Sequence, residues 1–159
     1  YQLLEYELAK DTGGAGKWRG GLGVVCRWRV ETEQLRCVTV GGGMREETRS
    51  FGLFGAKSAP PTIMRVFGQD GGRKELEVNQ FYEISQGDIF EVVSQGGGGF
   101  GDPFERPPEQ VRDDVLSGFV SAERALEDYG VVLKGAEVNI DWEETVKKRA
   151  SKIGESLKR

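Results

Sequence analysis

Glycine is the residue that most restricts how this chain can fold, because it is both abundant and clustered. The chain has 24 glycines among 159 residues, roughly twice the average usage of about 7%. They gather at residues 13–16, 20–21, 41–43 and 96–99. Without a Cβ, glycine adopts positive φ angles and lets another backbone approach closely. Such clusters either build irregular loops or present consecutive N–H groups to an anion, and the sequence leaves both interpretations open.

Two known phosphate-binding patterns do not fit these clusters. A P-loop needs glycine five positions before Gly-Lys and Ser or Thr after it. Here Asp11 stands five positions before Gly16-Lys17, and Trp18 follows. The dinucleotide pattern Gly-x-Gly-x-x-Gly fails as well, because Cys26 stands where its third glycine belongs. The sequence therefore contains neither kind of nucleotide-binding loop.

The chain has no histidine, which limits the chemistry that its own side chains can perform. It lacks the imidazole that serves as general base, as partner of a nucleophile and as the commonest transition-metal ligand. Cys26 and Cys37 match no zinc spacing and are too few for a disulfide framework. We expect two buried thiols that pack as small hydrophobic side chains. We therefore predict no catalytic residue and no metal site within the chain.

Composition and charge predict a soluble, cytoplasmic globular protein with neither a membrane nor nucleic acid as partner. Hydrophobic residues make up 37% of the chain and charged residues 30%, and no apolar run approaches the roughly 18 residues of a membrane span. Residues 1–60 carry nine Lys/Arg against seven Asp/Glu, too small an excess for a phosphate-binding surface.

The sequence begins without Met inside a strand-like pattern, so we expect a fragment of a longer polypeptide.

The apolar pattern changes near residue 105 from strands to helices. The expected strands are rich in Val, Ile, Phe, Tyr or Trp and lie at 2–9, 22–31, 34–40, 62–67, 75–84 with a break, and 88–94. In 22–31, Val24, Cys26, Trp28 and Val30 lie on one face, which predicts one core face and one wet face. A turn near Glu31–Gln34 would make 34–40 the antiparallel partner of 22–31, although it lacks a tight-hairpin signal.

Start and stop signals predict the first two helices after residue 105. Pro107 and Pro108 suit a first helical turn, where a missing N–H is tolerated, and Gly118 can end that helix in a left-handed conformation. The second helix is expected to begin after Ser121, whose hydroxyl can accept a bond from a free backbone N–H. Gly130 is its expected end.

A third helix and the fold class follow from the rest of the sequence. Asp141 and Glu144 have capping-box-like spacing, and the apolar residues Val146, Ala150, Ile153 and Leu157 recur at helical intervals. We expect this helix to pack as a surface strap. The whole chain is predicted to be α+β. A mainly antiparallel, glycine-rich β domain over 1–105 is followed by a three-helix segment over 106–159 that packs on it.

Charged residues beside the glycine clusters are the first candidates for a functional role. Lys17 and Arg19 flank Trp18 on a loop bracketed by glycines, where two cations suit an anionic ligand or a partner's carboxylate. The sequence favours the other interpretation, a solvated turn with Trp18 tucked into the core. Asp102 follows the four-glycine cluster in an Asp-Pro turn, which favours turn capping over a role as metal or hydrogen-bond acceptor.

Four segments resemble the C-terminal region of the hydantoinase B/oxoprolinase family in order and approximate spacing. They are GGAGKWRGGLGVV at 13–25, SFGLFGAK at 50–57, GDIFEVVSQGGGGFGDPFER at 87–106 and VRDDVLSGFVSAERALEDYGVVL at 111–133. The four-glycine Gly-Phe-Gly-Asp-Pro motif and the later Asp-Tyr-Gly-Val-Val are the most specific parts. Residues 136–159 carry no resemblance.

The resemblance implies a subunit that works with an ATP-dependent hydantoinase A-type partner. Such complexes open cyclic amides such as hydantoins, 5-oxoproline or lactams, and related members carboxylate ketones such as acetone and acetophenone. The family's metal site is associated with His and acidic residues of a larger N-terminal portion. We expect the C-terminal part of a hydantoinase B-type subunit in a cyclic-amide hydrolase. A ketone carboxylase and a non-catalytic assembly module are the alternatives.

The resemblance places no catalytic residue of the family on this chain, which we expect to be inactive alone. It binds no cofactor in this interpretation, and the complex is expected to use ATP with a divalent metal. The positions expected to approach a ligand or an interface between subunits are Lys17, Arg19, Gly96, Gly97, Gly98, Gly99 and Asp102. The expected neighbours are the hydantoinase A-type subunit, together with the remainder of the hydantoinase B-type subunit.

Overall fold

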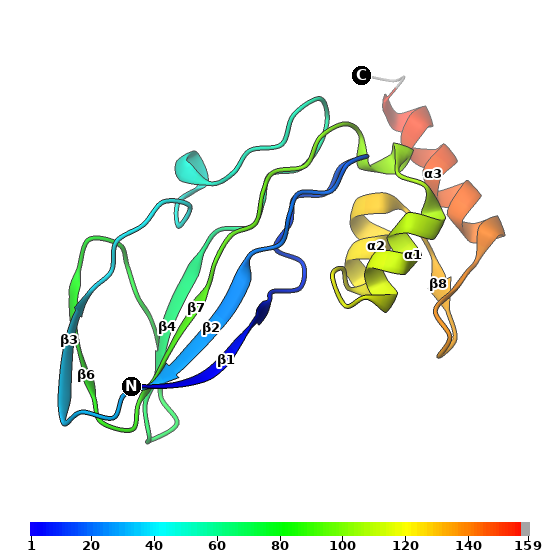
Figure 1. The fold of residues 1–159 in the computed structure, drawn as a ribbon. Helices are drawn as coiled ribbons and strands as arrows, with labels where there is room; N and C mark the ends of the chain where they lie inside the picture. Colours follow the sequence, from blue (N-terminus) through cyan, green and yellow to red (C-terminus); the bar gives the residue numbers. More distant parts are fainter. Residues whose placement is uncertain (157–159) are drawn as a thin grey trace.

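The computed structural model describes the backbone of residues 1–156 and the side chains of residues 1–151. Strands come first and helices follow, which confirms the predicted α+β order (Figure 1). The elements are β1 (Gln2–Leu8), β2 (Val24–Arg29), β3 (Gln34–Val38), β4 (Ile63–Phe67), β5 (Arg73–Glu75), β6 (Phe81–Ser85), β7 (Ile89–Val93), α1 (Pro108–Leu116), α2 (Ala122–Tyr129), β8 (Leu133–Lys134), β9 (Asn139–Ile140) and α3 (Trp142–Ser156). None of the helices described is long and apolar enough to cross a membrane.

Most strands of the first part form one antiparallel sheet in the order β1-β2-β7-β4-β5. We call it the five-stranded sheet. β3 and β6 form a separate antiparallel pair, and β8 and β9 form a short hairpin between the second and third helices. The predicted strand at 75–84 is broken, as expected, into β5 and β6. The β8–β9 hairpin was not predicted, because two-residue strands carry no periodic signal.

The predicted hairpin between residues 22–31 and 34–40 is wrong. β2 lies between β1 and β7, whereas β3 pairs with β6. Apolar side chains of β2, β3, β6 and β7 instead meet around a cavity of about 230 Å³, whose lining includes Trp28, Leu35, Cys37, Ile84 and Phe90. The apolar side chains of β3 are therefore half-buried against the face of the larger sheet, and β3 does not lie beside β2 in the same sheet.

A row of alternating charges crosses one face of the five-stranded sheet, with one residue from each strand. In sheet order it consists of Glu5, Arg27, Glu91, Arg65 and Glu75, and neighbours in the row are also register partners. Arg27 contacts Glu5 at 2.5 Å and Glu91 at 2.6 Å, and Arg65 contacts Glu91 at 3.0 Å. Only 1% of Glu91 is exposed. Because slipping one strand by a residue would separate these charges, the row fixes the strand register.

The two cysteines lie on this part of the chain, and neither forms a disulfide. Cys26 is buried, as predicted, whereas Cys37 is only half-buried. Burial raises the pKa of both thiols above the ordinary value. Both therefore favour the neutral thiol, as expected of side chains that pack as small hydrophobes.

The hydrophobic core of the helical part includes one residue from the glycine-rich part. Ala15 belongs to the same buried cluster as the helix residues Val111, Ala125 and Tyr129. The predicted helix ends are confirmed: α1 begins at Pro108, and the Ser121 hydroxyl accepts from the Arg124 N–H at 3.1 Å. Gly118 and Gly130 both take positive φ angles, of 75° and 64°, after α1 and α2.

The third helix begins as predicted, but polar side chains and not apolar ones attach it to the rest of the protein. Asp141 accepts from the Glu144 N–H at 3.2 Å, which confirms the capping prediction. The predicted apolar stripe is wrong, because Val146 is 63% exposed while Thr145 is buried. The Thr145 hydroxyl accepts from the Val132 N–H at 3.0 Å. Ala150 is exposed.

Arg149 also ties the third helix to the protein, by donating to the carbonyls of Tyr129 and Arg106 at 3.0 and 2.9 Å. The side chains of this helix thus form hydrogen bonds with backbone N–H and carbonyl groups of other segments. These hydrogen bonds attach the helix, whereas the sequence predicted attachment by an apolar stripe. The side chains of Ile153 and Leu157, the rest of that stripe, lie outside the described residues.

Candidate functional site

Three glycine-rich segments lie against one another beyond the end of the sheet, at residues 12–23, 50–57 and 95–101. We call them the glycine bundle. The N–H of Gly14 donates to the carbonyl of Gly97, and the N–H of Gly97 donates to Gly21, both at 2.9 Å. The middle segment joins through Lys57, whose N–H donates to Ala15 at 2.7 Å and whose carbonyl accepts from Gly99 at 3.1 Å. Backbone hydrogen bonds thus connect all three segments.

The bundle needs glycine because its backbones approach too closely for side chains. A Cβ at Gly98 would collide with the carbonyl of Phe51, and one at Gly20 with the carbonyl of Gly97. Cβ atoms at Gly96 and Gly99 would likewise meet backbone carbonyls. Gly97 differs, since a Cβ there meets its nearest atom at an ordinary contact distance of 3.4 Å. Close approach is thus the structural role of these glycines.

The N–H groups of the four-glycine cluster are largely used within the chain. Those of Gly96, Gly97 and Gly99 donate to the carbonyls of Thr12, Gly21 and Lys57. A donor already paired with a backbone carbonyl is not available to cradle an anion. A ligand- or interface-facing role for Gly96, Gly97, Gly98 and Gly99 stays a prediction, and any such contact would have to use the exposed side of the bundle.

The turn with Lys17 and Trp18 lies at the surface, next to the Asp-Pro turn. Trp18 and Phe100 exchange two backbone hydrogen bonds at 3.0 and 2.9 Å. Trp18 is nevertheless 62% exposed, so its predicted burial in the core is wrong. The Lys17 ammonium contacts Glu105 at 3.1 Å, with both side chains about half exposed. The backbone is thus held in place, whereas the Trp18 ring and Lys17 ammonium face solvent.

Arg19 is directed inward and binds a carboxylate of this same chain. Its Nε and Nη2 donate to the two oxygens of Asp114 in α1 at 3.1 and 3.2 Å, and Nη1 donates to the Gly20 carbonyl. Arg106 adds a third bond to Asp114 at 3.0 Å. The anionic partner predicted for Arg19 is therefore an internal aspartate. This buried cluster joins the glycine bundle to the helices.

Asp102 caps the short 3₁₀ turn at Pro103–Glu105. Its carboxylate accepts from the Phe104 N–H at 2.9 Å. This is the capping role that the Asp-Pro sequence favoured. Lys17, Arg19 and Asp102 thus lie around one junction, where the four-glycine segment turns toward α1, and their side chains contact different groups of the chain. A ligand- or interface-facing role for them stays a prediction.

Sequence reasoning missed a second charged cluster between the glycine bundle and α2. The Lys57 ammonium contacts Asp128 at 2.5 Å, and Arg124 contacts the other oxygen of Asp128 at 3.4 Å. They line a cavity of about 410 Å³ together with Asp11 and Arg49. Lys57 and Asp128 both lie in segments that carry the family resemblance. Their separation of 71 positions gave no signal that they meet.

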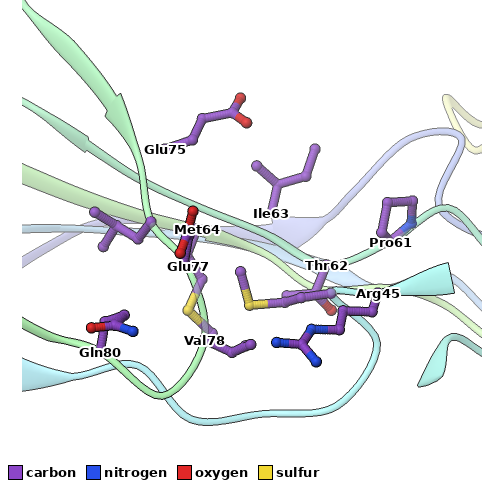
Figure 2. A pocket seen from close by; sticks show the side chains of 11 residues that line it. Arg45, Pro61, Thr62, Ile63, Met64, Glu75, Glu77, Val78 and Gln80 are labelled. Atoms are coloured by element: carbon purple, nitrogen blue, oxygen red, sulfur yellow. The ribbon is translucent and has the colours of Figure 1, made fainter. Parts of the chain in front are cut away.

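A cavity of about 510 Å³ lies between β4 and the segments around Met44 and Val78 (Figure 2). Its lining combines apolar and polar side chains: Met44, Arg45, Pro61, Thr62, Ile63, Met64, Glu75, Leu76, Glu77, Val78 and Gln80. Figure 2 shows the Glu75 carboxylate turned away from Arg45, and it pairs with arginines of β4 and β5. None of the predicted site residues lines this cavity.

The charged side chains at the junction of the bundle and the helices are paired within the chain. Across the residues that the structure describes, no group of three or more His, Cys, Asp or Glu is placed to hold a metal ion. The arginine, lysine and aspartate side chains nearest the glycine bundle pair with one another. These charge pairs and the backbone contacts of the glycine bundle form a platform that holds the bundle and the helices in fixed positions.

Comparison with known proteins places this platform in a family. Residues 1–103 match the family model described as hydantoinase B/oxoprolinase. The chain is 37% identical over 139 residues to the beta subunit of caprolactamase from Pseudomonas jessenii, covering 84% of this chain and 23% of that protein. It is 34% identical over 158 residues to the B subunit of a putative D-/L-hydantoinase from a Pseudomonas species, covering 91% and 24%. The chain thus spans about a quarter of the length of these relatives.

Solved structures agree with this assignment. The crystal structure of the ATP-dependent caprolactamase from Pseudomonas jessenii matches with a TM-score of 0.78 and 30% identity, over 94% of this chain and 26% of that one. A nucleotide-free acetone carboxylase structure matches with a TM-score of 0.82 over 99% of this chain and 25% of that one. At 24% identity, this second match shows a shared fold. The chain belongs to the hydantoinase B/oxoprolinase family.

Proposed function

We propose that this chain is the C-terminal part of a hydantoinase B-type subunit in an ATP-dependent complex that hydrolyses cyclic amides. The observation that carries the proposal is the 37% identity with the caprolactamase beta subunit over 84% of the chain. The 34% identity with the B subunit of the putative hydantoinase supports it. Both relatives are named for cyclic-amide substrates, whereas the carboxylase structure agrees with this chain in fold at lower identity.

Within such a complex, this part acts as a platform and not as the catalytic centre. The glycine bundle is closed by backbone contacts, and its neighbouring charges are neutralised inside the chain. ATP, the divalent metal and the reacting amide are then bound by a hydantoinase A-type subunit together with the remainder of the hydantoinase B-type subunit. The chain alone is inactive, and the complex is cytoplasmic.

Ketone carboxylation is the second candidate function. It is favoured by the 26% identity with the acetophenone carboxylase delta subunit of Aromatoleum aromaticum over 94% of this chain. An assembly module with no ligand contact is compatible with the same platform. The substrate of the assembled complex separates these candidates.

A chimeric complex tests the proposal. The segment of the Pseudomonas jessenii caprolactamase beta subunit that aligns with this chain is replaced by this chain, and the complex is assayed for caprolactam opening. We expect assembly and ATP-dependent ring opening. A control chimera receives the corresponding segment of the acetophenone carboxylase delta subunit, and both are also offered acetone with bicarbonate. An assembled chimera that carboxylates acetone or leaves caprolactam intact contradicts the proposal. Turnover of caprolactam or ATP by the isolated chain contradicts it as well.

Substitutions in the same chimera test the candidate site residues. Lys17→Ala and Asp102→Ala are expected to lower either assembly or ATP-dependent turnover, because both side chains lie where the bundle turns toward α1. Lys148→Ala is the matched control, because Lys148 is exposed on α3 and makes no ion pair among the described residues. If Lys17→Ala and Asp102→Ala both leave assembly and turnover unchanged, these residues face neither a ligand nor an interface between subunits.

A further inference from the structure

The cavity of about 510 Å³ beside β4 has walls that backbone hydrogen bonds hold in place. The Thr62 N–H donates to the Gly43 carbonyl at 2.8 Å, and the Leu76 N–H donates to the Met64 carbonyl at 2.9 Å. These two bonds tie the segments around Met44 and Leu76 to β4. The cavity is thus formed by the chain itself, and its volume lies within the range of about 300–1,000 Å³ that is usual for small-molecule sites.

The wall formed by residues 77–80 is anchored to Thr39, a residue that is only 2% exposed. The Thr39 N–H donates to the Gln80 carbonyl at 3.0 Å, and the Asn79 N–H donates to the Thr39 carbonyl at 2.7 Å. The Thr39 hydroxyl donates to the Glu77 carbonyl as well. The backbone that carries Glu77 into the cavity is therefore fixed from both ends.

Two charged side chains that line this cavity have no partner among the described residues. The Arg45 carbonyl accepts from the Thr48 N–H at 3.1 Å, but no ion pair or hydrogen bond engages its guanidinium. The Glu77 N–H donates to the Tyr82 hydroxyl at 2.8 Å, and its carboxylate is equally unengaged. Glu75, the third charged residue of the lining, is already paired with arginines of β4 and β5. One cation and one anion thus remain to bind a ligand.

The wall between these two charges is apolar. The apolar residues of the lining include Met44, Ile63, Met64, Leu76 and Val78. In Figure 2 the yellow sulfur atoms of the methionines lie between the Glu77 carboxylate and the Arg45 guanidinium. Thioethers are flexible and polarisable, so they adapt to the shape of an apolar ligand. A molecule that fits is therefore apolar in the middle, with a cation at one end and an anion at the other.

We propose that this cavity binds an ω-amino acid, a molecule with an ammonium group and a carboxylate at opposite ends of a methylene chain. Arg45 binds the carboxylate, Glu77 binds the ammonium group, and the apolar side chains contact the methylenes. An α-amino acid is a poorer ligand, because its two charges lie on neighbouring carbons and cannot reach both residues across the apolar wall.

The reaction proposed for the complex supplies such a molecule. Opening a lactam breaks the amide C–N bond, and water adds its hydroxyl to the carbonyl carbon and its proton to the nitrogen. At neutral pH the product carries a carboxylate at one end and an ammonium group at the other. This source of the ligand rests on the proposed function, whereas binding itself depends only on the cavity.

Methyl NMR of the complete chain tests the proposal, because both methionines of the chain line the cavity. With ¹³C-labelled methyl groups, each of the two signals reports on this site. The probe is 6-aminohexanoate, the molecule that opening of caprolactam yields. Leucine is its isomer with adjacent charges, and hexanoate and hexylamine each lack one charge. We expect 6-aminohexanoate to shift both signals saturably, with a Kd at least about threefold lower than for each control, as expected of an exposed ion pair.

Two substitutions assign the two ends of the ligand. Arg45→Gln should remove the difference in affinity between 6-aminohexanoate and hexylamine, because the carboxylate then has no partner. Glu77→Gln should remove the difference between 6-aminohexanoate and hexanoate. Arg29→Gln and Glu47→Gln are the matched controls, because both residues are exposed and lie outside the cavity lining, and they should keep the wild-type affinities. Circular dichroism verifies folding, and a general loss of structure would not produce this reciprocal pattern.

The chimeric caprolactamase complex shows whether the cavity stays open after assembly. Equilibrium dialysis with radiolabelled 6-aminohexanoate compares the chimera with the same chimera carrying Arg45→Gln. We expect the chimera without the substitution to bind one more molecule per copy of this chain. Equal binding would mean that another part of the complex fills the cavity, which would overturn the proposal.

Two results with the complete chain would also overturn it. One is equal affinity for leucine and 6-aminohexanoate, which would show that separated charges are not recognised. The other is the absence of any saturable shift of the methionine signals. Neither titration involves ATP or ring opening, so such results leave the proposed function untouched. A chimera that carboxylates acetone contradicts the proposed function and leaves binding by this cavity intact.

Discussion

The five-stranded sheet and the glycine bundle are built from the same extended stretches of chain, since the stretches that form β1, β2 and β7 run on from the sheet into the bundle (Figure 1). In the sheet, side chains decide which strands are neighbours, as in the charge row centred on Glu91. In the bundle, glycine stands at the contacts between segments. Backbone carbonyls occupy the space that a Cβ would need at Gly96, Gly98 and Gly99. One extended chain is thus ordered by its side chains in the sheet and by the absence of side chains in the bundle.

The difference sets what each region tolerates. The sheet is expected to suffer when a side chain is removed or neutralised, whereas the bundle is expected to suffer when a side chain is added. The helical part resembles the sheet in this respect, since its core and caps depend on side chains such as Tyr129 and Ser121. Four measurements test this difference between the regions.

The largest effect is expected for Gly98→Ala in the bundle. The new Cβ would collide with the Phe51 carbonyl, and neither backbone can move without separating two segments. We expect a loss of about 3 kcal/mol or more in the free energy of unfolding. Gly97→Ala is the matched control and should stay within about 0.5 kcal/mol, because its Cβ meets only an ordinary contact. Urea denaturation measures both, and equal losses would refute the close-approach account.

The sheet is tested next, by Glu91→Gln. This change leaves Arg27 and Arg65 without their shared buried charge. We expect a loss of about 2 kcal/mol, less than for a fully buried ion pair, because both arginines keep some contact with water. Glu75→Gln changes the exposed end of the same row and should cost much less, because water screens an exposed ion pair. If both substitutions cost the same in urea denaturation, burial of Glu91 does not control the register.

Alkaline titration tests the helical core through Tyr129. Burial raises the pKa of its hydroxyl from 10.0 to about 12. A raised folded-state pKa favours the protonated form, so this stabilisation is complete below pH 10 and is lost as pH rises toward 12. The loss amounts to about 2 kcal/mol. Tyr129→Phe should remove this pH dependence in thermal unfolding, whereas Tyr6→Phe on exposed β1 should keep it. A similar alkaline loss in Tyr129→Phe would contradict the assignment.

The smallest effect is expected from a helix cap. Ser121→Ala removes the hydroxyl that accepts from the Arg124 N–H and should cost about 1 kcal/mol. Ser117→Ala, at the exposed end of α1, is the control and should cost about 0.5 kcal/mol or less. Thermal unfolding of the two variants gives the difference. A loss at Ser121 as large as that at Gly98 would mean that the helices and the bundle unfold as one tightly coupled unit.

Local signals were the ones that sequence reasoning interpreted well. The caps at Ser121 and Asp141 and the turn at Asp102 each depend on residues at most three positions apart. The partner of Arg19 could not be predicted in this way, since Asp114 lies 95 positions later in the chain. Pairing of β2 with β1 and β7 failed for the same reason, because adjacency along the chain favoured β3.

The order of strands and helices and the helix ends could be predicted from the sequence, because capping and periodicity act within a few residues. Whether the glycine clusters serve close backbone approach could not, because that depends on contacts between distant segments. Which carbonyl each glycine approaches, which carboxylate each cation binds and which strands are neighbours became clear only in the folded structure. Those contacts join residues far apart in the chain, and burial together with backbone hydrogen bonding selects among partners that are locally equivalent.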